Sequence, residues 1–299
     1  MPSTLLQVVN KAERELGFTA SSTVIDNTDE QAVQMLNLLN GLGNDLVKEY
    51  DWQQLQTEYG FSTVFFTYTG TTTSGSTTLS ALSSTTGLTT NPTYFHVTGA
   101  GIPRDTTLVS VNAGAGTAVI SREATATGTT VSITFGQTSY ANPSDFDRLI
   151  DRTEWDKSTT WEIGGPQTPQ LWQWLKAGGL ASGPGSLFRI YGNLFRIWPP
   201  PASEDYLRFE YVSTFWVATS SGGTPTKASY TIDTDASIFP DRLLETGLKL
   251  RYAQANGMEW LLADNPWGFT RTFNRLLSEL KAQDAGSPTL RMAPQRREI

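Results

Sequence analysis

Residues 187–201 read LFRIYGNLFRIWPPP, so the tetrapeptide LFRI occurs twice around a Tyr-Gly-Asn spacer and three prolines follow. Residues 192–193, Gly-Asn, form a two-residue loop that tolerates positive φ, which suits a tight antiparallel turn. The stretch therefore predicts a β-hairpin that ends at the prolines, because proline has no N–H to donate to a strand ladder. The predicted cross-strand pairs are Tyr191 with Leu194, Ile190 with Phe195, Arg189 with Arg196, and Phe188 with Ile197.

The predicted hairpin has one apolar face and one mixed face, because side chains alternate between the two faces of a strand. The apolar face carries Phe188, Ile190, Phe195 and Ile197. The mixed face carries Arg189, Arg196, Tyr191, Leu194, Leu187 and Trp198. Like charges directly opposite each other are unfavourable without a counter-charge. We therefore expect an acid near the two arginines, either Glu210 on the following strand, 205–217, or an acidic group of another subunit.

The composition excludes several classes of function. The chain has 299 residues, a net charge of −7 and no cysteine. The acidic balance argues against a broad basic surface that holds duplex DNA, but it permits a channel through which DNA merely passes. Disulfides, thiol chemistry and zinc-thiolate sites are excluded. No apolar run approaches the ~20 residues of a membrane span, and we expect neither a signal peptide nor a membrane partner.

Apolar stripes at helical spacing predict helices at both ends of the chain. They cover residues 4–16, 28–50, 240–255 and 269–280, and a short helix is expected at 169–177. Thr28 with Gln31 has the spacing of a capping box and is expected to begin the second helix. Each stripe is too narrow to be stable alone, so the N- and C-terminal helices are predicted to form one bundle.

Residues 70–137 are rich in Ser and Thr, and short β-rich runs alternate there with turn signals. This pattern predicts a small all-β, sandwich-like module, whereas a disordered linker would lack the recurring apolar residues. The predicted fold class is α+β: a helical bundle, an antiparallel β domain and the inserted module. The expected domains are a core of 1–69 with 138–285, the insert 70–137, and an extended C-terminal arm, 286–299.

The sequence contains no motif that indicates catalysis. His96 is the only histidine, and because no nucleophile elbow accompanies it we interpret it as structural. P-loop, dinucleotide-binding and HExxH patterns are missing, and the acids 145–147 lack the glycine and distal Glu of an EF-hand. We therefore predict no enzymatic activity, no catalytic residues, no cofactor and no metal.

An acidic cluster is the best candidate for an enzyme centre, since paired carboxylates can hydrolyse glycosides and tryptophans can stack on sugars. Its acids are Asp145, Asp147, Asp151, Glu154 and Asp156, and the nearby tryptophans are Trp155, Trp161, Trp172 and Trp174. Basic residues alternate with these acids, which favours a solvated ion-pair surface instead. They are Arg148, Arg152 and Lys157.

Three stretches resemble the head-to-tail adaptor of short-tailed bacteriophages, the group that includes tail tubular protein A. They are NGLGNDLVKEYDWQQLQTEYGFST, PSDFDRLIDRTEW with IYGNLFRIWPPPASEDYLRFEYVSTFWV, and FPDRLLETGLKLRYAQANGMEW. Together they cover most of 1–69 and 138–285. Residues 70–137 depart from compact adaptors, and TGAGIPRDTTLVSVNAGAGTAVIS is similar to β modules inserted in diverse phage virion proteins.

The resemblance implies a structural virion protein in the phage neck or tail, assembled in the host cytoplasm. Such adaptors form a homo-oligomeric ring, commonly a dodecamer, that joins the portal protein to a tail nozzle or tube. The ring lines the channel for DNA ejection, through which DNA passes without sequence-specific binding. Tail fibres are a further candidate partner of the insert. The alternatives are a neck stopper or nozzle component, a host-attachment module that binds glycans through the insert, and a hydrolase.

The resemblance also implies two sets of contact residues. The mixed hairpin face could meet acids across a subunit boundary, and its candidate interface residues are Arg189, Arg196, Tyr191 and Trp198. The C-terminal arm of such adaptors often reaches the portal, although a frayed terminus is the alternative here. The candidate portal-docking residues of the arm are Arg291, Arg296 and Arg297.

Overall fold

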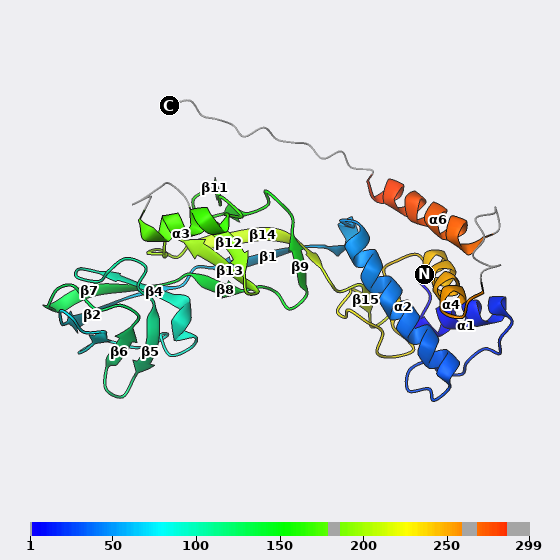
Figure 1. Cartoon of the computed structure of the whole chain (residues 1–299), viewed down its shortest axis with the longest axis horizontal. Coiled ribbons are helices and arrows are strands. Elements are labelled where there is room, and N and C mark those ends of the chain that lie inside the picture. The colour runs from blue at the N-terminus through cyan, green and yellow to red at the C-terminus, as the bar shows by residue number, and fades with distance from the viewer. Residues whose placement is uncertain (1, 179–185, 259–267, 286–299) are drawn as a thin grey trace, which may run out of the picture. The chain divides into compact units, whose positions relative to one another are not determined.

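The computed structural model describes residues 2–178, 186–258 and 268–285. Its mixed α+β character matches the predicted fold class, with five α-helices in these ranges and several antiparallel sheets (Figure 1). The chain divides into two compact units. The first unit comprises Met1–Thr57, Asp145–Arg148 and Val212–Ile299, and the second comprises Glu58–Ser144 and Leu149–Tyr211.

The first unit contains helices from both ends of the chain. Helix α4 contacts α1, α2 and α6 (Figure 1), so N- and C-terminal helices pack against one another. The buried side chains of α1 and α2, among them Leu5, Val9, Met35 and Leu39, form the apolar face of these contacts. The elements of this unit are α1 (Leu5–Leu16), α2 (Glu30–Glu49), β15 (Val217–Ala218), β16 (Ala236–Ser237), α4 (Asp241–Ala255) and α6 (Phe269–Asp284).

Two helix starts differ in detail from the sequence prediction. The capping box lies at Thr4 and Gln7, at the start of α1. Helix α2 begins one residue after Asp29, whose carboxylate accepts the backbone N–H of Gln31, so Thr28 does not cap it. The prediction for Thr28 is therefore wrong, because a carboxylate stands one residue further on and is at least as good an N-cap as threonine.

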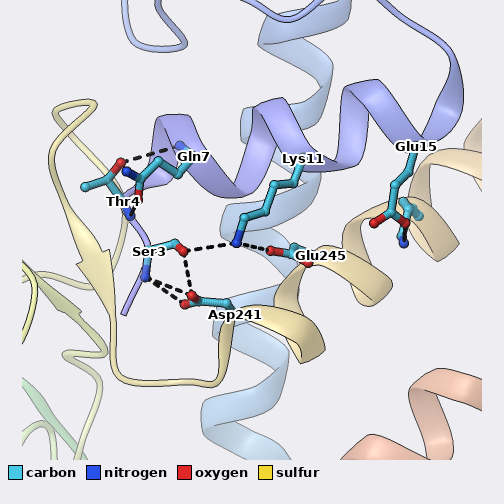
Figure 2. Close-up of polar contacts among 8 residues, drawn as sticks. Ser3, Thr4, Gln7, Lys11, Glu15, Asp241 and Glu245 are labelled. Atoms are coloured by element: carbon cyan, nitrogen blue, oxygen red, sulfur yellow. Dashed lines mark hydrogen bonds and ion pairs between the residues drawn. The ribbon is translucent and has the colours of Figure 1, made fainter. Parts of the chain in front are cut away.

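Polar contacts tie the N-terminal segment to the start of α4. The backbone N–H of Ser3 donates to the Asp241 carboxylate at 2.8 Å, and Lys11 Nζ lies 2.9 Å from Glu245 Oε1 (Figure 2). Asp241 is the first residue of α4, where the helix dipole stabilises a negative charge. These contacts explain how α1 is held against α4 beyond the burial of its apolar stripe.

The second unit contains the predicted hairpin. The four predicted cross-strand pairs between β12 and β13 are confirmed, and a fifth pair, Leu187 with Trp198, extends the ladder. Gly192 and Asn193 have φ of 62° and 57°. Strand β8 extends this sheet, and α3 follows the predicted range 169–177. The elements are β8 (Ser139–Ala141), β10 (Trp155–Asp156), β11 (Trp161–Glu162), α3 (Pro169–Ala177), β12 (Leu187–Tyr191) and β13 (Leu194–Trp198).

A second sheet faces the apolar side of the hairpin. Its strands run in the order β1-β14-β10-β11, and β9 pairs with β14. The ring of Phe195 on β13 stacks on Phe209 of β14 at 5.1 Å between centroids, and Phe61 of β1 lies 5.8 Å from Phe195. The two sheets therefore meet through aromatic inner faces. The strands are β1 (Gln56–Ser62), β9 (Phe146–Leu149) and β14 (Tyr206–Ser213).

The Ser/Thr-rich stretch 70–137 is folded and is not a disordered linker. Two three-stranded antiparallel sheets, β2-β7-β4 and β3-β6-β5, share a core that includes the fully buried Leu88, Leu108 and Phe135. These residues are the recurring apolar positions that a linker would lack. The strands are β2 (Phe65–Thr72), β3 (Thr78–Leu79), β4 (Phe95–Gly99), β5 (Leu108–Asn112), β6 (Thr117–Ile120) and β7 (Gly128–Gln137).

Candidate assembly surface

The mixed face of the hairpin brings two arginines onto one aromatic ring. The guanidinium carbons of Arg189 and Arg196 lie 4.7 and 4.2 Å from the centroid of the Tyr191 ring. A ring face carries partial negative charge and attracts a cation within about 6 Å. This arrangement reduces the repulsion between the two opposed arginines. Tyr191 is still 37% exposed, so part of its ring is available for contact with a partner.

The expected counter-charge from Glu210 is not found. Within residues 2–178, 186–258 and 268–285, neither Arg189 nor Arg196 forms an ion pair. The reason is geometric: Phe209 faces the hairpin, so its neighbour Glu210 points to the opposite face of β14. Arg196 Nη1 donates to Ser139 Oγ at 3.2 Å, while its Nε is buried without a hydrogen-bond partner.

Trp198 lies at the other end of the hairpin from the turn and contacts a polar cluster. Its ring meets the His96 ring edge-on at 5.2 Å. His96 Nε2 lies 3.1 Å from Asp105 Oδ1, and Lys176 Nζ lies 2.9 Å from the same oxygen. Burial alone would raise the pKa of the Asp105 carboxyl, but the hydrogen bonds from His96 and Lys176 together lower it. These contacts support a structural role for His96.

The first acids of the predicted acidic cluster stabilise backbone and loops. Arg148 Nη2 donates to the carbonyl of Tyr50 at 3.0 Å, just after the last residue of α2, and Arg148 also pairs with Asp51 and Asp147. Cations at a helix C-terminus satisfy its free carbonyls and favour its dipole. Asp145 accepts a hydrogen bond from Ser213 Oγ at 2.6 Å. Of the alternating acids and bases, Asp147 and Arg148 therefore form an ion pair of the kind that the sequence analysis favoured.

The later acids of the cluster have separate environments. Asp156 accepts the backbone N–H of Ser158 at 2.8 Å and the hydroxyl of Thr159, which closes a turn. Glu154 is 1% exposed and its Oε1 has no hydrogen-bond partner; burial raises the pKa of this carboxyl to about 7. In the described part of the chain, no three or more His, Asp or Glu residues gather as ligands for a metal ion.

The sequence analysis missed a second surface, on the outer face of the sheet that contains β14. Trp155 and Tyr206 are each 40% exposed there, and Arg208 pairs with Glu58 at 3.0 Å. Trp155 lies opposite both Arg208 and Glu162 in the register, so all three share this face. The alternation of Tyr206, Arg208 and Glu210 with buried residues along β14 is the sequence pattern that predicts this outer face.

The candidate residues of the C-terminal arm, Arg291, Arg296 and Arg297, lie outside the described residues. Among the helices that the structure does describe, none is long and apolar enough to cross a membrane.

Exposed tryptophan, tyrosine and arginine side chains on two sheet faces are typical of protein–protein interfaces. Surfaces of this kind suit a protein that acts through assembly. The sequence model of the SU10 adaptor protein family matches residues 105–297, more than half of the chain, and the chain belongs to that family. It is thus a structural adaptor of a phage, a component of the virion that associates with other phage head and tail proteins. No curated protein sequence gives a significant match to the chain.

Proposed function

We propose that this adaptor is a head-to-tail connector that joins the portal to the tail nozzle or tube of a short-tailed phage, in the manner of tail tubular protein A. Copies form a closed ring, commonly of twelve, that lines the DNA channel. The match to the SU10 adaptor family over residues 105–297 carries this proposal. It is assembled in the host cytoplasm. It has no enzymatic activity, because its sequence carries no catalytic motif and, within the acidic cluster, Asp147 is used in an ion pair and Asp156 in a turn.

We also propose the finer architecture that the sequence analysis expected. The N- and C-terminal helices form one bundle, for which the packing of α4 against α1, α2 and α6 is the support. The core comprises 1–69 and 138–285, and 70–137 is an inserted, sandwich-like module. The shared core of its two sheets supports this division. In this division the insert, 70–137, is the part that could contact tail fibres or a neighbouring subunit. Residues 286–299 are the extended C-terminal arm.

The proposed contact residues fall into two groups. Arg189, Arg196 and Tyr191 contribute to the subunit interface, supported by two arginines without an ion pair in the described ranges. We assign Trp198 to the same interface, because it lies on the same face of the hairpin at the end away from the turn. The arm docks on the portal through Arg291, Arg296 and Arg297, an expectation that rests on the resemblance alone.

The test is to mix the purified full-length chain with the portal protein of the same phage and to image the mixture by negative-stain electron microscopy. We expect a ring of adaptor copies attached to one end of the portal. Deleting residues 287–299 should leave a folded chain that binds the portal poorly. A full-length chain that binds the isolated nozzle but never the portal would instead identify a neck stopper or nozzle component.

A further inference from the structure

The hairpin sheet, β12-β13-β8, and the β14 sheet, β1-β14-β10-β11, expose faces that point in opposite directions. Their inner faces meet through the Phe195–Phe209 and Phe61–Phe195 ring contacts. Because alternate residues of a strand point to opposite sides, Arg189, Arg196 and Tyr191 lie on the far side of the hairpin sheet. By the same rule, Tyr206, Arg208 and Glu210 lie on the far side of the β14 sheet. This pair of sheets therefore has two outer faces, back to back.

The two outer faces have opposite charge. The hairpin face carries Arg189 and Arg196, and the register places no acid among its other side chains. The β14 face carries three acids, Glu58, Glu162 and Glu210, against two bases. Arg208 is already paired with Glu58, and Lys157 lies two residues beyond Trp155, where its backbone N–H donates to the carbonyl of Tyr206. Within the part of the chain that the structure describes, Glu162 and Glu210 form no ion pair. The hairpin face thus has two arginines without an ion pair, and the β14 face has a net negative charge.

Both faces also carry exposed aromatic side chains that suit a contact. Tyr191 is 37% exposed on the hairpin face, and Trp155 and Tyr206 are each 40% exposed on the β14 face. Tryptophan, tyrosine and arginine are the residues most enriched among those that dominate binding energy in interfaces. Such rings next to unpaired charges give each face both apolar area and electrostatic complementarity.

We propose that the hairpin face of one copy docks on the β14 face of the next copy, with Arg189 and Arg196 opposite Glu162 and Glu210. This contact rests on the proposed ring and specifies how its subunits meet. A ring needs a head-to-tail contact between two different surfaces of the same chain, and two complementary faces on opposite sides of one unit provide it. A two-fold symmetric contact through either face would instead bring like charges together.

The test uses two charge-reversal variants of the full-length chain. The hairpin variant is Arg189→Glu with Arg196→Glu, and the sheet variant is Glu162→Arg with Glu210→Arg. Assembly is measured by sedimentation velocity with and without the portal protein, and circular dichroism verifies folding. Each variant alone should assemble at least about tenfold more weakly than the natural chain, because reversal places like charges across the contact. Glu123→Arg, an exposed reversal in 70–137, is the control and should assemble normally.

An equimolar mixture of the two variants is the decisive measurement. In a head-to-tail contact, the reversed hairpin of one variant meets the reversed sheet of the other, and the two natural faces also meet, so the mixture should assemble. Normal assembly of either variant alone, or failure of the mixture when both variants are folded, overturns this contact and leaves the ring itself intact. If the natural chain assembles neither alone nor with the portal, the ring fails and this contact fails with it.

Discussion

Replacing Gly43 with alanine should destabilise the first unit, although alanine is the better helix former. An added Cβ at this position of α2 would lie 2.1 Å from Cζ2 of Trp216 and 2.2 Å from its Cη2. Carbon atoms pack best at about 3.5 Å, so the ring or the helix must shift by roughly 1.4 Å. Trp216 is fully buried, and its Nε1 donates to the carbonyl of Ala228 at 2.8 Å and to Asn44 at 3.1 Å. The shift therefore also strains two hydrogen bonds.

These terms give a net loss. Overpacking costs about 1–3 kcal/mol, weakening the indole hydrogen bonds costs about 1 kcal/mol, and the higher helix propensity of alanine returns about 1 kcal/mol. We expect the free energy of unfolding to fall by about 2 kcal/mol in urea titrations followed by far-UV circular dichroism. A Gly43→Ala chain as stable as the natural one would refute the close approach of α2 to Trp216.

Two further variants isolate the cause. Gly41→Ala lies in the same helix, but its nearest neighbour is Arg251 Nη1 at 3.1 Å, the end of a flexible side chain. It should be neutral or stabilising by up to about 1 kcal/mol. In a Trp216→Phe background the clashing atoms of the larger ring are absent, so Gly43→Ala should cost much less, with a coupling of about 1 kcal/mol or more.

Three other substitutions test polar contacts, each by urea unfolding. Arg148→Met removes the cation at the end of α2 and its pair with Asp51, and should cost about 1–3 kcal/mol; no loss would show that these contacts are not formed. Asp235→Asn removes the charge of a fully buried carboxylate that pairs with Lys227, and should cost about 3 kcal/mol, so an unchanged midpoint would contradict it. Burial raises the pKa of Glu154 from 4.5 to about 7, so the folded state binds the proton more tightly and stability should fall as pH rises from 4.5 to 7, by up to roughly 3 kcal/mol. Glu154→Gln should lack most of this fall, and an equal pH dependence in both chains would assign it to another group.

The hairpin could be predicted residue by residue because its determinants are local. The Gly-Asn loop sets the register, and the alternation of apolar and polar residues then assigns each side chain to a face. The helices were predictable for a similar reason, and α3 begins and ends where the pattern predicted, at Pro169 and Ala177. The start of α2 was predicted one residue too early. Thr28 and Asp29 are adjacent and both are good N-cap residues, so the sequence does not show which of them caps the helix.

The surroundings of these local elements could not be predicted, because they depend on which sheet covers which face. The two arginines were correctly placed opposite each other, but Glu210 could be excluded as their partner only once Phe209 was seen against Phe195. The contact of Trp198 with His96 joins residues about a hundred positions apart, and no pattern near either residue indicates it. The buried state of Glu154 likewise depends on packing, since its neighbours in sequence are mostly polar.

The extent of the family match bears on which surface the proposed ring uses. The sequence that this chain shares with the SU10 adaptor model lies in residues 105–297. The arginine pair, Tyr191 and the exposed residues of β10, β11 and β14 all lie within that range, whereas α1, α2 and Glu58 precede it. The four charged residues of the proposed contact, Arg189, Arg196, Glu162 and Glu210, therefore all lie within the part of the chain that matches the family. A contact made by α1 and α2 would instead depend on residues outside the shared sequence, which makes the sheet faces the better candidate for the common interface.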